Sequence, residues 1–214
     1  MNILVFGGTG FIGRPVIARL QGRGHNVRCL SRDTARAKDL LGEGVDLLDF
    51  DLSDLELIKE IELADVIINL AGEQLAGVRW SESKKKKFHE SREGINKLIV
   101  NAISNCKTPP SLFISASAVG VYGDRGNELL TENSLPNSDY LSQLCLDWED
   151  AAIEAEKHGV RVCTLRLGVV LGREGGVLKQ VMPTFELGVG TYLGDRDQKV
   201  PWVHIFDVVK VKER

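Results

Sequence analysis

The feature that most constrains this chain is the segment GGTGFIG at residues 7–13, which directly follows the apolar run NILVF at residues 2–6. Gly7 permits a tight turn, Gly10 lets the backbone approach a pyrophosphate, and Gly13 allows a helix to pack closely on a strand. Amides at the start of the following helix favour negatively charged phosphates. A glycine triplet between a strand and a helix therefore predicts a dinucleotide site. We expect the contacts to come from Gly7, Thr9, Gly10, Phe11, Ile12 and Gly13.

Apolar runs bounded by turns alternate with stretches of helical periodicity along the whole chain. The apolar runs predict buried strands at residues 2–6, 26–30, 45–50, 65–70, 111–116 and 160–167. The periodic stretches predict helices at residues 11–23, 34–41, 54–62, 81–104 and 141–158. This alternation predicts an α/β, Rossmann-like fold, with a doubly wound parallel sheet and helices on both faces. We expect residues 1–214 to form a single NAD(P)-binding domain, with residues 168–214 beginning an incomplete substrate-binding part.

The composition excludes several classes of partner. A net charge of -3 gives no basis for binding nucleic acid or an anionic membrane. No apolar run approaches the roughly eighteen residues that span a bilayer, and no secretory signal precedes the first strand. The four cysteines lack metal-binding spacing, so we expect reduced thiols and no metal. The expected location is the cytoplasm, or an organelle stroma or matrix if a transit peptide has been removed.

The end of the second predicted strand indicates which dinucleotide is bound. Folds of this type that prefer NAD place an acid there, which binds the ribose 2'-hydroxyl. Here the position falls on Ser31, followed by Arg32, and a hydroxyl with a guanidinium suits a 2'-phosphate. Asp33 is the counterargument, and its alternative role is to cap the helix at residues 34–41. We therefore favour NADP(H) over NAD(H), with Ser31 and Arg32 as cofactor contacts.

The order of four motifs resembles the extended short-chain dehydrogenase/reductase superfamily. These motifs are GGTGFIG, DFDLSD, NLAGE and SASAVGVYG. In that superfamily the pair that matches Asp51 and Leu52 contacts the adenine, and the residues that match Leu70, Ala71 and Gly72 line the cofactor. The resemblance implies the same roles in this chain.

Further motifs narrow the resemblance to an atypical subgroup. The segments NLAGEQLAGVRW, ESR, LCLDWEDAA, LRLGVVLGREGG and PWVHIFD are similar to proteins named NAD-dependent epimerase family proteins, some of them formerly named cell-division inhibitors. Members of that subgroup usually continue past the last of these motifs with further sheet and a segment that covers the substrate, whereas this chain ends at Arg214. We expect apolar surface left bare by that difference to favour a homo-oligomer.

The resemblance also implies an acid–base mechanism that uses a tyrosine, a lysine four residues later, and a serine. The serine position is intact at Ser117, just past the predicted strand at 111–116. Ser117 is therefore the candidate that hydrogen-bonds the substrate oxygen, and Ser115 beside it is expected to contact the cofactor.

The tyrosine and lysine positions depart from the superfamily pattern. Aligned on Glu149 of the WEDAA motif, the tyrosine slot falls on Leu141 and the lysine slot on Cys145. Tyr140 is the remaining candidate acid, but it lies one residue early, about 100° around a helix. Without the lysine a tyrosine keeps a pKa near 10 and is a poor base. Cys145 has no activating neighbour in the sequence, so a packed thiol is the better reading than a nucleophile.

Three further residues are candidates for binding a substrate: Arg79, Tyr122 and Arg166. Arg79 offers a charge for an anionic substrate, and its alternative role is helix capping or surface pairing. Tyr122 matches a residue on the substrate side in the superfamily, and its alternative is a place in the core. Arg166 ends a predicted strand at the ligand edge of the sheet, where it could also anchor the loop at residues 168–176. Two functions follow from these features. One is an NADP(H)-dependent oxidoreductase or epimerase-like enzyme with an unknown small carbonyl or sugar-type substrate. The alternative is a non-catalytic NADP(H) sensor or scaffold that lacks the Tyr-x-x-x-Lys pair.

Overall fold

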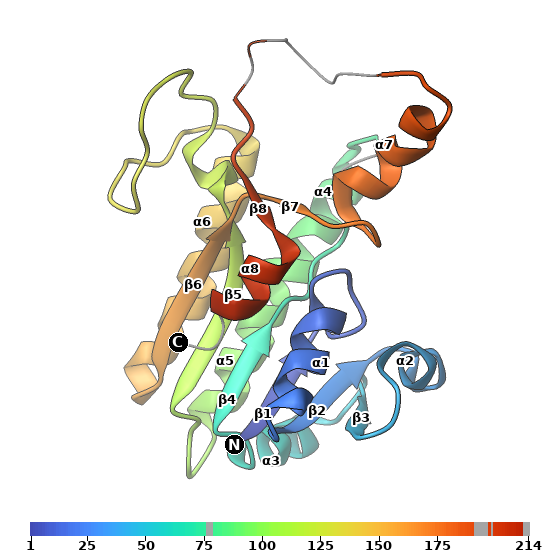
Figure 1. The fold of residues 1–214 in the computed structure, drawn as a ribbon. Coiled ribbons are helices and arrows are strands. Elements are labelled where there is room, and N and C mark those ends of the chain that lie inside the picture. Colours follow the sequence, from blue (N-terminus) through green and yellow to red (C-terminus); the bar gives the residue numbers. More distant parts are fainter. Residues whose placement is uncertain (76–78, 191–196, 198, 212–214) are drawn as a thin grey trace.

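A six-stranded parallel sheet, ordered β3-β2-β1-β4-β5-β6, forms the centre of the protein (Figure 1). The computed structural model describes residues 1–75, 79–190, 197 and 199–211. The strands are β1 (Asn2–Phe6), β2 (Asn26–Ser31), β3 (Val45–Asp49), β4 (Val66–Asn69), β5 (Leu112–Ala118) and β6 (Arg161–Leu167). The chain builds the sheet outward from β1 to β3 and then crosses back to β4, so the direction of winding reverses beside β1. The predicted doubly wound α/β fold is confirmed.

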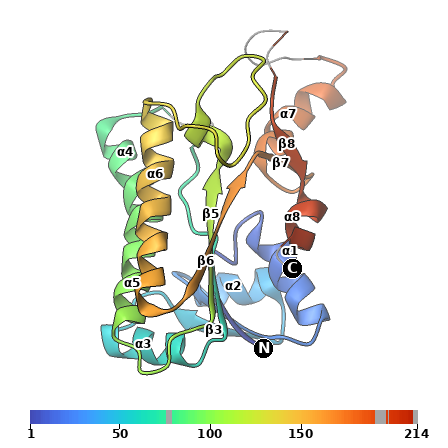
Figure 2. The same ribbon diagram turned by 90° about the vertical axis from the view of Figure 1, so that its left-hand side faces the viewer.

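Helices cover both faces of this sheet (Figure 2). The helices are α1 (Gly13–Gly22), α2 (Thr34–Leu41), α3 (Asp54–Glu62), α4 (Glu82–His89), α5 (Ile95–Ser104), α6 (Tyr140–Ile153), α7 (Gly176–Glu186) and α8 (Ile205–Val211). Helices α4, α5 and α6 lie on one side of the sheet, and α1 and α8 lie on the other (Figure 2). Among the described residues, no helix is both long enough and apolar enough to cross a bilayer.

The alternation of side chains along each strand supplies both hydrophobic cores. In β1, Leu4 and Phe6 pack in a cluster with residues of α3, α5 and α6. Ile3 and Val5 point the other way and pack with residues of α1 and α8. All four side chains are buried, and each such burial contributes about 1.5–3 kcal/mol. A strand that is apolar on both faces therefore fixes the position of β1 and, with it, the position of the glycine loop that follows.

Capping residues explain why two helices have the predicted bounds. The Asp33 side chain accepts a hydrogen bond from the Arg36 amide at 2.9 Å and begins α2. Ser53 and Glu56 form a reciprocal capping box that begins α3. The alternative reading of Asp33 as a helix cap is therefore confirmed.

The long helix expected over residues 81–104 is interrupted. A π-helical turn, Glu90–Gly94, separates α4 from α5. Ser91 Oγ donates to the Phe88 carbonyl oxygen at 3.1 Å, and the Arg92 guanidinium donates to the same oxygen. Two side chains of the turn thus bind one carbonyl oxygen of the preceding helix. Such turns are frequent at functional sites.

Residues beyond β6 form a small layer beside the main sheet. Strand β7 (Val169–Leu171) pairs in parallel with β8 (Trp202–His204), and α7 follows β7. This two-stranded sheet and α7 were not predicted, because strands of three residues carry no readable periodicity. Helix α8 packs against α1 through Val209 in the second core.

Candidate functional site

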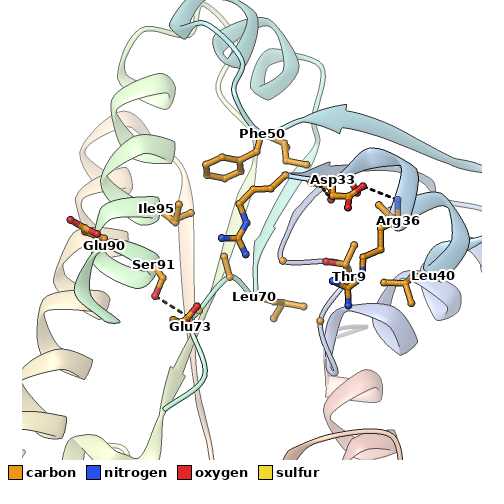
Figure 3. Close-up of a pocket in the computed structure, with 18 of the residues that line it drawn as sticks. Thr9, Asp33, Arg36, Leu40, Phe50, Leu70, Glu73, Glu90, Ser91 and Ile95 are labelled. Carbon is orange, nitrogen blue, oxygen red and sulfur yellow. Dashed lines mark hydrogen bonds between the residues drawn. The ribbon is translucent and has the colours of Figure 1, made fainter. Parts of the chain in front are cut away.

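A cavity of about 630 Å³ lies at the carboxyl ends of β1, β2 and β4, where the winding reverses (Figure 3). Open α/β sheets bind ligands at this position, and the volume is typical of small-molecule sites. The walls are the glycine loop, the start of α2, the loop after β4 and the π-helical turn. The lining residues are Gly7, Thr9, Gly10, Leu30, Ser31, Arg32, Asp33, Arg36, Ala37, Leu40, Phe50, Leu70, Ala71, Gly72, Glu73, Lys87, Glu90, Ser91 and Ile95.

The glycine loop has the geometry that a pyrophosphate requires. Gly7 has a φ of 76°, and a Cβ there would lie 2.6 Å from the Ala71 amide nitrogen. A Cβ on Gly13 would lie 2.4 Å from the Gly7 carbonyl oxygen, so only glycine lets α1 begin directly behind the loop. Gly10 is exposed in the cavity wall and leaves space in front of the helix. A bare loop at a helix start fits a bound diphosphate.

Two guanidinium groups line the end of the cavity near β2. Arg32 and Arg36 are exposed, and within the described part of the chain neither forms a salt bridge. In Figure 3 the Arg36 side chain extends toward Thr9 of the glycine loop. Ser31 is buried beneath them, where its hydroxyl donates to the Asp33 carbonyl oxygen. Arg36 was not selected as a cofactor contact from the sequence, because the position of its side chain over the glycine loop depends on how the first turn of α2 is oriented.

The loop after β4 forms the opposite wall. Leu70, Ala71 and Gly72 all line the cavity, and their predicted contact with the cofactor stays a prediction. The Ala71 amide donates to the Asn69 side chain at 2.9 Å, and the Glu73 amide donates to Ser91 Oγ at the same distance. These two bonds fix the loop to β4 and to the π-helical turn.

Several residues predicted to contact the cofactor lie outside this cavity. The Phe11 ring packs against the glycines of the loop after β7, and Ile12 joins the core under α1. Leu52 packs against the core on the other face, Asp51 is exposed, and their neighbour Phe50 lines the cavity instead. Ser115 is fully buried and accepts a hydrogen bond from Asn96 Nδ2 at 2.9 Å. The expected cofactor contact of Ser115 is therefore corrected to a structural bond, because α5 covers this part of β5.

The candidate catalytic residue Ser117 belongs to a buried polar network. Its hydroxyl donates to Glu149 Oε1 at 2.5 Å. Arg166 donates to both oxygens of the same carboxylate, from Nε at 2.9 Å and from Nη2 at 2.7 Å. A third donor, Arg166 Nη1, reaches the Tyr122 hydroxyl at 2.8 Å. The pKa of Arg166 is raised, chiefly by the bond with Glu149.

Tyr122 and Arg166 are both bound within this network and neither lines the cavity, so their predicted contact with a substrate stays a prediction. Tyr122 is 6% exposed, and Arg166 is bound on both edges of its guanidinium. Because Ser117 donates its proton to Glu149, only its lone pairs remain for another group. Ser117 is itself 3% exposed and is not among the residues that line the cavity, so its predicted contact with a substrate oxygen stays a prediction.

The Tyr140 side chain contacts α4. It is the first residue of α6, and its hydroxyl donates to the Lys85 carbonyl oxygen at 3.3 Å. The Trp80 ring packs edge-on against Tyr140, with ring centroids 5.6 Å apart. Burial raises the pKa of Tyr140, so its hydroxyl stays protonated at neutral pH. These contacts hold the Tyr140 hydroxyl at α4, and its role as the catalytic acid stays a prediction.

The two remaining sequence candidates take surface and core positions. Cys145 is buried, as expected for a packed thiol, and burial raises its pKa to about 11. Arg79 is exposed and is not among the residues that line the cavity. Its predicted contact with a substrate stays a prediction.

Comparison with known proteins agrees with the motifs. A family model described as the NAD dependent epimerase/dehydratase family matches residues 3–212. The chain is 35% identical over 219 residues to the chloroplastic epimerase family protein SDR39U1 homolog of Arabidopsis thaliana, covering 99% of this chain and 61% of that protein. It is 36% identical to epimerase family protein SDR39U1 of Mus musculus, covering 99% of this chain and 69% of that protein. The chain thus spans about three fifths of the Arabidopsis relative.

Solved structures show the same relationship. The crystal structure of human epimerase family protein SDR39U1 (isoform 2) with NADPH has a TM-score of 0.81 and 31% identity, covering 100% of this chain and 69% of that one. The nucleoside-diphosphate sugar epimerase from Corynebacterium glutamicum has a TM-score of 0.81 and 32% identity, covering 100% of this chain and 43% of that one. A family model that matches nearly the whole chain and relatives above 30% identity together show that the chain belongs to the NAD dependent epimerase/dehydratase family.

Proposed function

We propose that this protein binds NADP(H) and acts as an oxidoreductase or epimerase-like enzyme on a small carbonyl or sugar-type substrate. The observation that carries the cofactor assignment is the pair of guanidinium groups, Arg32 and Arg36, without carboxylate partners among the described residues. Asp33, the nearest acid, is engaged as a helix cap. Two positive charges suit a 2'-phosphate, which NAD lacks. The human SDR39U1 structure with NADPH supports the same choice.

The two walls of the cavity would contact different parts of the cofactor. The loop from Gly7 to Gly13 and the first amides of α1 would hold the pyrophosphate. Arg32 and Arg36 would hold the phosphorylated adenosine, and the loop after β4 would contact the other half. When bound, the cofactor supplies or accepts a hydride. In that reaction Ser117, which donates to Glu149, would accept a hydrogen bond from the substrate hydroxyl and orient it.

The test is a melting-temperature titration with NADPH, NADP, NADH and NAD. We expect the phosphorylated pair to stabilise the protein at concentrations where the other pair does not, since only ligands that bind the native state raise the melting temperature. The double variant Arg32→Gln/Arg36→Gln should lose this preference. Lys38→Gln, on the same helix but paired with Glu43, is the control and should keep it. Equal stabilisation by NADH and NADPH in the wild type would show that the assignment is wrong.

A second candidate function is a non-catalytic NADP(H) sensor or scaffold. It is favoured by the bond of Tyr140 to the Lys85 carbonyl and by the apolar residue Leu141 in the expected tyrosine slot. The two functions differ in turnover. An enzyme consumes NADPH with a carbonyl or sugar substrate, and Ser117→Ala lowers that rate by about 10²-fold or more. A sensor binds NADPH without consuming it, and Ser117→Ala leaves the affinity unchanged.

A further inference from the structure

Three side chains that are suited to bind a metal ion meet outside the cofactor cavity. His89 is the last residue of α4, Glu93 belongs to the π-helical turn, and Asp147 lies in α6. One atom from each, an imidazole nitrogen or a carboxylate oxygen, lies within 4.8 Å of the other two. None of the three residues lines the cavity, and the proposed function assigns none of them a role.

The distances in this cluster are close to those of a zinc site. His89 Nδ1 lies 3.5 Å from Asp147 Oδ2 and 3.8 Å from Glu93 Oε2. Zinc binds nitrogen and oxygen ligands at about 2.0–2.2 Å, so two ligand atoms of a tetrahedral site lie about 3.4 Å apart. A small movement of the side chains would therefore place a zinc ion between all three atoms.

A neighbouring side chain holds the outer oxygen of each carboxylate. Lys97 Nζ lies 2.5 Å from Glu93 Oε1, and Gln143 Nε2 donates to Asp147 Oδ1 at 2.7 Å. These bonds orient the carboxylates with their other oxygens, Oε2 and Oδ2, toward His89. Partners of this kind fix the ligands of metal sites in proteins.

The charges and the exposure of the cluster also suit a divalent cation. Two carboxylates that face one imidazole nitrogen repel each other, and a divalent ion between them offsets this repulsion more fully than a single imidazolium does. The side chains of His89, Glu93 and Asp147 are 30%, 26% and 29% exposed, so water can reach a bound ion. The Tyr140 ring packs edge-on against the imidazole, with ring centroids 5.8 Å apart.

The type of ligand indicates which metal is bound. Magnesium and calcium take six or more oxygen ligands, whereas this cluster offers one nitrogen and two oxygens. An imidazole with two carboxylates suits zinc, which is often held by three protein ligands and one water molecule. The expectation that the chain holds no metal depended on cysteine spacing, which gives no information about ligands from three separate elements.

We propose that His89, Glu93 and Asp147 bind a zinc ion through Nδ1, Oε2 and Oδ2, with water as the fourth ligand. The ion joins the end of α4 and the π-helical turn to α6. Ser91 of that turn lines the cavity, so zinc also stabilises one wall of the proposed cofactor site. The metal site itself uses no cavity residue, and its test needs no cofactor.

The test is a calorimetric titration of chelator-treated protein with zinc chloride, in the absence of a dinucleotide. We expect one zinc ion per chain in the wild type. His89→Ala and Asp147→Asn each remove a ligand and should weaken binding by more than about 100-fold, and Gln143→Ala, which removes only an orienting bond, by about 10-fold. Cobalt bound in place of zinc should give the visible absorption of a four-coordinate site, and His89→Ala should abolish it.

Two matched variants control for binding of zinc to any surface histidine or acid. His158→Gln removes an exposed histidine, and Glu154→Gln removes an acid that binds Lys157 much as Glu93 binds Lys97. Both should bind zinc as the wild type does. Circular dichroism of each variant shows whether it is folded, so a loss of zinc binding in a folded protein is assigned to the ligand.

The possible outcomes decide the inference. Loss of the site in the two ligand variants, with both controls unchanged, supports it. Equal zinc binding by His89→Ala and the wild type, or equal losses in the ligand variants and the controls, would mean an adventitious ion only and overturn it. No zinc binding by the wild type, or displacement of zinc by an equal concentration of magnesium, would also overturn it.

Discussion

Replacing Arg166 with methionine should destabilise the protein far more than removing an ordinary surface ion pair. Arg166 binds both oxygens of Glu149, whose side chain is 5% exposed, while the Arg166 side chain is 26% exposed. Removing one partner of a buried pair costs about 3–5 kcal/mol, because the other charge is left buried. Water reaches the Arg166 side of the pair, so we take the lower end, about 3 kcal/mol. For a chain of this size that corresponds to a fall of roughly 6–12 °C in melting temperature.

The assay is equilibrium unfolding in denaturant, followed by circular dichroism, for a small set of variants. Arg125→Met is the matched control, because Arg125 also binds a carboxylate through two nitrogens, but both partners are about a third or more exposed. Its expected cost is about 1 kcal/mol or less. Adding Glu149→Gln to Arg166→Met should recover about 1–2 kcal/mol, since a neutral amide is cheaper to bury than an unpaired carboxylate. Equal midpoints for Arg166→Met and Arg125→Met would refute the reasoning.

Three further results are expected. Gly10→Ala should abolish NADPH binding, measured by calorimetry, with little change in melting temperature. Gly13→Ala should instead lower the melting temperature, because a Cβ on residue 13 would lie 2.4 Å from the Gly7 carbonyl oxygen. Cys145, with a pKa of about 11, should react with iodoacetamide much more slowly in the native protein than in denaturant, as mass spectrometry can measure. Asp139 caps α6, and the hydrogen bond from the Ser142 amide holds its pKa below the ordinary value. Its charge therefore stabilises the protein fully at pH values above that ordinary pKa. This stabilisation is lost as the pH falls through the lowered pKa. Melting temperatures of the wild type and Asp139→Asn should therefore converge in acid; a constant difference would contradict this assignment.

The fold was predictable wherever local chemistry marks the ends of an element. Helices α2 and α3 begin where Asp33 and Ser53 supply caps, and their observed bounds equal the predicted ones. The pairing of β7 with β8 was not predictable, because each strand has three residues and the partners lie about thirty residues apart. The π-helical turn at 90–94 was also missed, since its stabilising bonds come from side chains that suit an ordinary helix equally well.

The site was predictable in its backbone and only partly in its side chains. The glycine loop and the β4 loop follow from spacing, because their roles need backbone geometry alone. Ser115 and Ser117 lie on the same face of β5, and their different environments depend on how far α5 covers that face. Arg36 was missed because its position over the glycine loop depends on the direction of α2, which the sequence alone does not give. Tyr140 could be doubted from its register, and the structure adds the reason: its hydroxyl bonds to α4.

The π-helical turn has a consequence for how the cavity is kept open. Ser91 accepts from the amide of Glu73, and Arg92 donates to the carbonyl oxygen of the same residue. In an ordinary helix two consecutive residues point about 100° apart, and a single peptide segment would meet only one of them. The π-helical turn presents both Ser91 and Arg92 to the loop after β4. It thereby binds the amide and the carbonyl oxygen of Glu73, as a neighbouring strand would. The π-helical turn thereby helps to fix the wall of the cavity that contains Gly72 and Glu73.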